Sequence, residues 1–381
     1  MVTAAEPDMT RTGVGRVGAS DVARHVGIPL SIFLVSRVVV WSLFGALGVS
    51  EGHSVMHLLG SWDSKWYLTV AQNGYATAIP AGVGKLAQTD LGFFPLLPIL
   101  IRATHVLTGL GFGVSAVLTS TVLGALAAVA LWWLLADTYD LAAAELGTAL
   151  VFFSPAAFVL AMFYSESAII LFVSLCLLML GRRQWILAGL AAALATSADP
   201  VAVAVVVPCV VAAIGAIRSR RDYGALAAPL LAPVGVGAFF TYLWAHTGSF
   251  FQWFHAQRNG WQEGAYGSGL PHAFAHVWNL GFADPNDTVR VLSAFATLAM
   301  LMAFARARPP LTWTVYVAVV LAMGLYSPIV GITPRLLLRG FPLFAALGVG
   351  RSPRAGAALL VLSTSALAVL TILSATWHWT P

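Results

Sequence analysis

The 381-residue sequence contains few charged residues. Asp, Glu, Lys and Arg make up 9% of it and hydrophobic residues 59%, whereas soluble domains contain about 25% charged residues. A soluble fold could not cover its surface with so few charges. The same apolar composition excludes an intrinsically disordered chain. The composition therefore predicts a membrane protein with several spanning segments.

The sequence also has few cysteines, no clustered basic residues and no common catalytic motif, and each of these argues against a further class of protein. The two cysteines, Cys176 and Cys209, lie inside apolar runs, where free thiols are usually buried, so we expect core thiols and no disulfide. The basic residues form no clustered basic face, which argues against a nucleic-acid partner. Motifs of serine hydrolases, zincins and P-loop proteins are absent. No Cys/His spacing indicates a metal site, so we name no metal ligand and no cofactor, and metal dependence stays open.

Apolar runs recur along the chain after a polar tail over residues 1–26. A spanning helix needs about 20 residues, and the pattern predicts an all-α polytopic fold with about 10–12 transmembrane helices in a single domain over residues 27–381. The stretch 92–107 is interrupted by Pro95, Pro98 and Arg102, which favours a helix in the membrane interface. The expected spans are about 28–48, 113–136, 147–164, 166–181, 185–199, 200–217, 224–247, 289–305, 311–327, 335–350 and 355–376.

The arginines predict the orientation, because cytoplasmic loops are enriched in basic residues. The tail and alternate loops carry Arg11, Arg16, Arg24, Arg182, Arg183, Arg218, Arg220, Arg221, Arg306, Arg308, Arg351 and Arg354. We therefore expect the protein to lie in the cell membrane with its N-terminus on the cytoplasmic side. One loop disagrees, since Asp137, Asp140 and Glu145 fall on the cytoplasmic side without a basic partner. Two long loops, 49–112 and 248–288, are then on the outer face.

Both long loops are rich in aromatic residues. Their aromatic side chains are Trp62, Trp66, Tyr67 and Tyr75 in the first loop and Trp253, Trp261, Tyr266 and Trp278 in the second. Such residues can form an interfacial belt, or they can form platforms on which sugar rings stack. Under the second interpretation we expect Trp62, Trp66, Tyr67, Gln257 and Trp261 to contact a sugar or an acceptor.

Asp63 lies in the densest polar and aromatic cluster, Ser61-Trp62-Asp63-Ser64-Lys65-Trp66-Tyr67. If residues 62–72 are helical, Asp63, Trp66 and Tyr67 share one face. A partly desolvated carboxylate at the membrane edge is a candidate general base. The alternative is that Asp63 caps the helix by accepting a backbone N–H.

Other charged residues interrupt apolar sequence. Glu166 is either a paired, functional acid or an acid favoured at a helix start. Asp199 precedes Pro200, which breaks a helix, so one interpretation is that it only marks the outer turn. Arg37 lies inside the first span, where it can snorkel or neutralise an acid. Arg335 and Arg339 begin a late span on the outer side; a lipid phosphate is a natural partner for Arg335, and an ion pair with Asp63, Glu166 or Asp199 is the alternative.

Several motifs together resemble the PIG-V-like mannosyltransferases of the GT-C class of polytopic glycosyltransferases. The resemblance covers about residues 30–350. It depends on Trp62-Asp63-Ser64-x-Trp66-Tyr67-Leu68, Phe93-Phe94-Pro95-Leu96-x-Pro98, Ser154-Pro155, Tyr164-Ser165-Glu166-Ser167, and Arg335 with Phe341-Pro342-Leu343-Phe344. The sequence departs from the family near Ser197-Ala198-Asp199-Pro200, where many relatives have an arginine.

The resemblance implies a function and a set of roles. It implies Asp63 as the catalytic residue, a polyprenyl-phosphate sugar as donor, mannose as the sugar, and transfer with inversion to a glycolipid or lipoglycan acceptor. Tyr164 and Glu166 match the family's Tyr-Ser-Glu element, which implies that both belong to the acceptor or sugar site. Glu166 would orient the Asp63 loop or bind a sugar hydroxyl. Arg335, with Arg102 or Lys65, would stabilise the donor phosphate. The competing class is a transporter or flippase of lipid-linked sugars, although no internal repeat relates the two halves of the chain.

Overall fold

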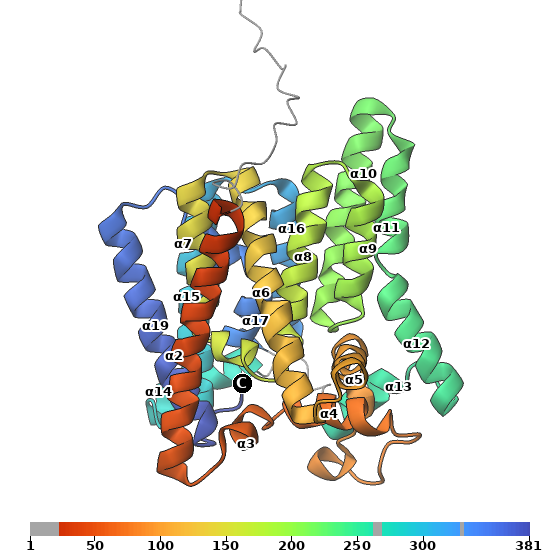
Figure 1. Ribbon diagram of the computed structural model, residues 1–381, viewed down its shortest axis with the longest axis vertical. Helices are drawn as coiled ribbons and strands as arrows, with labels where there is room; N and C mark the ends of the chain where they lie inside the picture. Colours follow the sequence, from red (N-terminus) through yellow and green to blue (C-terminus); the bar gives the residue numbers. More distant parts are fainter. Residues whose placement is uncertain (1–22, 262–268, 328–330) are drawn as a thin grey trace, which may run out of the picture.

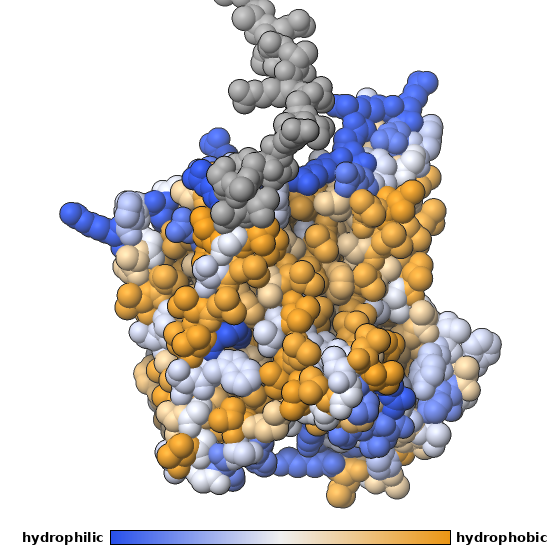
Figure 2. Space-filling view, viewed as in Figure 1, coloured by the Kyte–Doolittle hydropathy of each residue, from blue (hydrophilic) through white to orange (hydrophobic). Residues whose placement is uncertain are grey.

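The computed structural model describes residues 23–261, 269–327 and 331–381. In these residues the chain is helical and contains no strand. Most helices run side by side along the long axis of the molecule (Figure 1). On the face drawn in Figure 2, apolar residues dominate the middle of the molecule, and polar residues gather toward both ends. The predicted all-α multi-pass membrane fold is confirmed.

Six segments of the described chain are long and apolar enough to cross a membrane. They contain α2 (Ile28–Glu51), α6 (Phe112–Thr138), α10 (Val206–Arg220), α11 and α12 (Ala227–Leu231 and Val234–Thr247), α15 (Pro285–Ala307) and α19 (Pro353–Ala375). Five shorter apolar helices accompany them: α5 (Leu96–Thr108), α7 (Leu141–Phe152), α8 (Glu166–Gly181), α9 (Trp185–Thr196) and α16 (Leu311–Tyr326).

The sequence determines where several of these helices begin and end. The side chain of Asp284 accepts a hydrogen bond from the N–H of Asn286 and begins α15, and Ser352 caps α19 in the same way through the N–H of Ala355. A proline follows each cap, because the first helical position needs no N–H donor. At the other end of α2, Gly52 has φ 70°, a backbone conformation that glycine adopts without strain.

The prediction of one continuous span over 147–164 is wrong. Helix α7 ends at Phe152, and the chain then runs through Ser154-Pro155 and a 3₁₀ turn to Tyr164, buried throughout except for Pro155. Non-helical backbone at membrane depth is tolerated where protein surrounds it. Arg37 of α2 donates to the carbonyl oxygens of Ala157 (3.0 Å) and Phe152 (3.4 Å). Arg37 therefore satisfies backbone carbonyl groups where α7 ends, and it forms no ion pair with an acid among the described residues.

The prediction of a span over 335–350 is also wrong. Two short helices, α17 (Pro334–Arg339) and α18 (Pro342–Ala346), replace it. The chain breaks at Gly340-Phe341 because Pro342 cannot donate the hydrogen bond that would continue α17. Arg335 and Arg339 lie one turn apart on α17, so both side chains can point to the same side.

The two long loops meet at one end of the molecule (Figure 1). The first contains α3 (Val55–Leu59), α4 (Ser64–Asn73) and α5, and the second contains α13 (Gln252–Gly260) and α14 (Gly269–Leu280). Trp253 and Gln257 of α13 both donate to the carbonyl oxygen of Gly92, at 3.0 and 3.1 Å. These bonds join the two loops into one layer.

The arginine-rich ends of the helices lie at the opposite end of the molecule (Figure 1). Arg182 pairs with Asp137 at 2.9 Å and Arg183 with Asp222 at 3.0 Å. Asp137 therefore has a basic partner, contrary to the expectation from the sequence. Asp140 caps α7 by accepting from the N–H of Ala143.

Candidate active site

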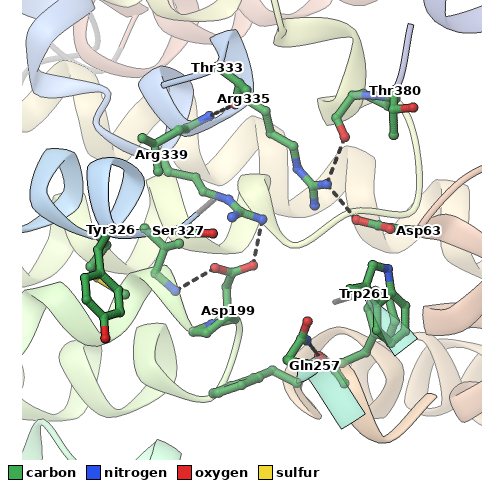
Figure 3. A pocket seen from close by; sticks show the side chains of 18 of the residues that line it. Asp63, Asp199, Gln257, Trp261, Tyr326, Ser327, Thr333, Arg335, Arg339 and Thr380 are labelled. Carbon is green, nitrogen blue, oxygen red and sulfur yellow. Dashed lines mark hydrogen bonds and ion pairs between the residues drawn. The ribbon is translucent and has the colours of Figure 1, made fainter. Parts of the chain in front are cut away.

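A cavity of about 860 Å³ lies between the layer of loop helices and α17. Its lining includes Asp63, Tyr67, Asp199, Trp253, Gln257, Trp261, Asn286, Arg290, Arg335 and Arg339. Arg335 and Arg339 reach into it from α17, and Gln257 and Trp261 face them from the other side (Figure 3). Charged groups thus occupy one wall and aromatic groups another.

Asp63 stands at the N-terminus of α4, but its side chain does not cap the helix. The Asp63 carboxylate points into the cavity, where its Oδ2 lies 2.6 Å from Nη1 of Arg335 (Figure 3). Trp62, directly before it, has φ 54°, in the left-handed region that is uncommon for a tryptophan. The geometry therefore favours the carboxylate as a functional group over the helix cap.

Three hydrogen bonds fix the start of α4 against the segment between α7 and α8. The N–H of Asp63 donates to the Tyr164 hydroxyl at 3.2 Å. The N–H of Phe163 donates to Oγ of Ser64 at 3.1 Å, and the Tyr67 hydroxyl donates to Oγ of Ser165 at 3.2 Å. The Trp62–Tyr67 and Tyr164–Glu166 motifs, about a hundred residues apart, therefore form one unit that holds the Asp63 backbone in place.

Five charged side chains form an alternating chain of ion pairs. Its order is Asp63, Arg335, Glu166, Arg339 and Asp199. The contacts are 2.6 Å for Asp63–Arg335, 2.5 Å for Arg335–Glu166, 3.0 Å for Glu166–Arg339 and 2.8 Å for Arg339–Asp199. Charges buried this deeply need such partners, because an isolated charge in an apolar interior is very costly.

The members of this chain differ in exposure. The side chain of Asp63 is 28% exposed, whereas those of Glu166 and Asp199 are 0% and 3% exposed. Glu166 lies between two guanidinium groups and does not line the cavity. Three carboxylates face two guanidinium groups, so the chain has one formal negative charge in excess. Asp63, at its exposed end, is the carboxylate best able to change its partner.

The surroundings of Arg335 keep its guanidinium charged. Burial alone would lower the pKa of Arg335, but the Glu166 and Asp63 carboxylates raise it well above its usual range. The guanidinium also lies 4.4 Å from the centre of the Tyr164 ring, a favourable cation–π geometry. Tyr67 remains a neutral hydrogen-bond donor, because burial raises its pKa.

Aromatic side chains from both loops form the facing wall. Phe93, Trp253 and Trp261 line the cavity. Trp66 does not line it but supports it, since its ring lies 5.9 Å from that of Phe93 and 6.0 Å from that of Trp261. The wall offers flat apolar faces beside the amide of Gln257, as a sugar site requires.

Six residues proposed from the sequence do not line the cavity: Trp62, Trp66, Tyr164, Glu166, Arg102 and Lys65. Trp62 donates to the carbonyl oxygen of Ser374 at 3.2 Å and packs on Trp377. Arg102 donates to the carbonyl oxygens of Ala71 and Gln72, at 2.7 and 2.8 Å, and so caps the end of α4. Lys65 is exposed beside the Trp66 ring. Neither cation lines the cavity, so the geometry does not favour them as phosphate ligands.

Sequence reasoning overlooked other residues at the site. Asn286 and Arg290, one turn apart on α15, both line the cavity. A signal was present for Arg290, because it precedes the long apolar part of α15 and has Asp287 one turn before it.

The solved structures provide the comparison with known proteins. No model of a known protein family matches the chain, and no curated protein matches it. The fold is similar to that of ArnT from Cupriavidus metallidurans, whose crystal structure was determined bound to undecaprenyl phosphate. The TM-score is 0.55 with 16% identity over 87% of this chain and 62% of that one. The chain therefore spans less than two thirds of the ArnT length, and the likeness confirms the GT-C fold.

Proposed function

We propose that this protein is a membrane glycosyltransferase that transfers a hexose from a polyprenyl-phosphate donor to an acceptor hydroxyl, with Asp63 as general base. The observation that carries the proposal is the position of Asp63. Its carboxylate opens on a large cavity between arginines and aromatic rings, in a chain with a GT-C fold. A cavity of this composition suits a ligand with an anionic and a sugar part.

The ion pair between Asp63 and Arg335 gives the donor phosphate a place to bind. Phosphate offers several oxygen atoms to a guanidinium group and can replace one carboxylate oxygen. Arg335 would keep its contact with Glu166, which holds the side chain in place from the side opposite the cavity. Exchange of Asp63 for the phosphate would free Oδ2 of Asp63 to accept a proton. Donor binding would therefore prepare the base.

The reaction balances without a further reactant. The acceptor oxygen attacks the anomeric carbon of the sugar and gives its proton to Asp63. The bond from that carbon to the phosphate oxygen breaks, and the polyprenyl phosphate leaves with the electron pair. Arg335, with Arg339 and Arg290 near it, would stabilise the phosphate charge that develops. Attack from the face opposite the phosphate inverts the anomeric centre, through a transition state of oxocarbenium character.

Several features of the proposal rest on the resemblance to the PIG-V-like family. These are mannose as the sugar, α-linkage in the product, and a glycolipid or lipoglycan as acceptor. The undecaprenyl phosphate bound to ArnT supports a polyprenyl-linked donor for the present chain. The arginine-rich opposite end supports a cytoplasmic N-terminus and a site on the outer face of the cell membrane.

Transfer from synthetic, radiolabelled polyprenyl-phosphate sugars tests the proposal. The purified protein is reconstituted in vesicles with the lipid fraction of the native membrane as acceptor source, and donors carrying mannose, glucose or galactose are compared. We expect transfer by the wild type and a loss of about 10²–10⁴-fold in Asp63→Asn, the usual share of a general base. Glu51→Gln, an exposed change at the end of α2, is the control and should retain activity.

Two results would contradict the proposal. Normal transfer by a correctly inserted Asp63→Asn protein would remove Asp63 as the base. Movement of the labelled donor across the vesicle membrane without transfer to any acceptor would support a flippase instead.

A further inference from the structure

A cluster of histidine and aspartate side chains lies where α14 meets the start of α15. Nδ1 of His276 is 2.6 Å from Oδ2 of Asp287, and Nδ1 of His272 is 3.8 Å from the same oxygen. The candidate ligand atoms of His276, Asp284 and Asp287 all lie within 4.8 Å of one another. We propose that these side chains bind a divalent transition-metal ion of the zinc type.

The donor set fits zinc better than magnesium or calcium. Two imidazoles and two carboxylates suit a borderline metal, whereas magnesium and calcium prefer oxygen atoms alone. Ligand bonds of about 2.0–2.2 Å in a tetrahedron place the donor atoms roughly 3.4 Å apart. The two separations from Asp287, 2.6 and 3.8 Å, lie on either side of that value. Small side-chain rotations would therefore complete the site.

The candidate ligand atoms of His276, Asp284 and Asp287 already lie within 4.8 Å of one another, and His272 approaches the same Asp287 oxygen. His272 and His276 are four residues apart on α14, so they share a face. Asp287 is in the first turn of α15 and its side chain is 8% exposed. Asp284 uses Oδ1 to accept from the N–H of Asn286, and a carboxylate has a second oxygen to offer a metal.

The local charges leave room for a cation. Asp284 and Asp287 bring two negative charges, and Arg290 brings one positive charge, 3.7 Å from Oδ1 of Asp287. A buried carboxylate is costly unless it is paired or coordinates a metal. A proton shared between His276 and Asp287 is the competing explanation of the 2.6 Å contact. The two explanations differ in the role of His272, whose side chain is 68% exposed. It is a ligand if a metal binds, and it takes no part if His276 and Asp287 share a proton.

The position of the cluster indicates a structural role. The ligands join α14 to the first turn of α15, and the same stretch of α15 carries Asn286 and Arg290 in the cavity wall. A metal ion bound here would hold that wall in place without touching the donor or acceptor. The inference does not depend on the reaction proposed above.

Metal binding by the full-length protein tests the proposal. The protein is purified in detergent, treated with a chelator and titrated with Zn²⁺, with Mg²⁺ and Ca²⁺ in parallel. We expect one high-affinity Zn²⁺ per chain by calorimetry and by elemental analysis after dialysis, and a rise in the melting temperature with Zn²⁺ alone. Loss of a group that only hydrogen-bonds to a metal ligand weakens metal binding about 10–100-fold. His276→Gln and Asp287→Asn remove proposed ligands themselves, so each should weaken Zn²⁺ binding at least as much.

Two further variants keep the test decisive. His272→Gln changes an exposed side chain and should fold normally, yet it should weaken Zn²⁺ binding at least tenfold. His255→Gln, an exposed histidine on the neighbouring α13, is the matched control and should bind Zn²⁺ as the wild type does. An absence of tight Zn²⁺ binding by the wild type, unchanged affinity in His272→Gln and His276→Gln, or equal affinity for Mg²⁺ would overturn the proposal. The His276–Asp287 contact would then be a simple ion pair.

Discussion

Arg335 and Asp63, which are 272 positions apart in the sequence, are joined by a 2.6 Å hydrogen-bonded ion pair at the wall of the cavity. The same guanidinium group holds Glu166 through its Nε. Arg335 thus has one partner that is fully buried and one that faces the cavity. This asymmetry explains how the arginine could remain fixed while its outer partner is exchanged for an anionic ligand.

Replacing Arg335 by lysine should impair transfer strongly. Lysine is a point charge and cannot bridge Glu166 and a phosphate with the fixed geometry of a guanidinium group. We expect a loss of about 10²–10³-fold in kcat, the range for loss of one preorganised donor to a developing charge. Steady-state transfer rates measure it, with Arg354→Lys, an exposed change at the start of α19, as the control. An Arg335→Lys enzyme as fast as the wild type would show that this residue does not contact the donor phosphate.

Replacing Glu166 by glutamine should destabilise the protein. The change leaves two buried guanidinium groups without the carboxylate between them. Removal of one partner of a buried ion pair costs about 3–5 kcal/mol. The melting temperature in detergent should fall clearly in Glu166→Gln, whereas Glu145→Gln, an exposed acid of α7, should leave it unchanged. A rise in the acceptor KM with normal stability would instead favour the direct contact with a sugar hydroxyl that the sequence suggested.

Replacing Tyr164 by phenylalanine tests the bond that positions Asp63. The phenyl ring beside Arg335 is kept, but the N–H of Asp63 loses its hydroxyl acceptor. The Asp63 N–H is partly buried, so its loss of a partner costs at most about 1–3 kcal/mol, and a small displacement of a catalytic group can reduce the rate by up to about a hundredfold. We expect kcat to fall and the protein to remain folded.

Tyr139→Phe is the matched control for that change. Among the described residues, the buried hydroxyl of Tyr139 has no hydrogen-bond partner, so its removal should leave stability unchanged or raise it slightly. Equal kcat values for Tyr164→Phe and Tyr139→Phe would show that the Tyr164 hydroxyl does not position the base.

The sequence predicts the membrane fold well because hydropathy over about 20 residues reports on the bilayer directly. It predicts the breaks after Phe152 and at Gly340 poorly, since both segments are mainly apolar and hydropathy does not distinguish a spanning helix from buried irregular backbone. In these segments Pro155 and Pro342 were the available indications.

The sequence predicts which residues belong to the candidate site better than it predicts which of them contact one another. Glu166, Asp199, Arg335 and Arg339 interrupt apolar sequence, which marks them as paired or functional, and Asp63 lies in a dense polar and aromatic cluster. Their order along the ion-pair chain depends on how four separate segments meet, and no local pattern contains that information. For the same reason the sequence left open whether Arg335 pairs with protein carboxylates or with a phosphate.

The packing of α12 against α9 provides a last test, because Asp199 lies three residues after the end of α9. A Cβ atom on Gly235 of α12 would overlap the carbonyl oxygen of Ala193 and lie 2.7 Å from both the N atom of Ser197 and Oγ1 of Thr196. Overpacking of this kind typically costs about 1–3 kcal/mol. Gly235→Ala should therefore lower the melting temperature and, by displacing the end of α9, reduce transfer.

Gly237, two residues further along the same helix, has open space at its Cβ position, so Gly237→Ala should be neutral or stabilising by up to about 1 kcal/mol. Equal melting temperatures for the two variants would contradict the close approach of these helices.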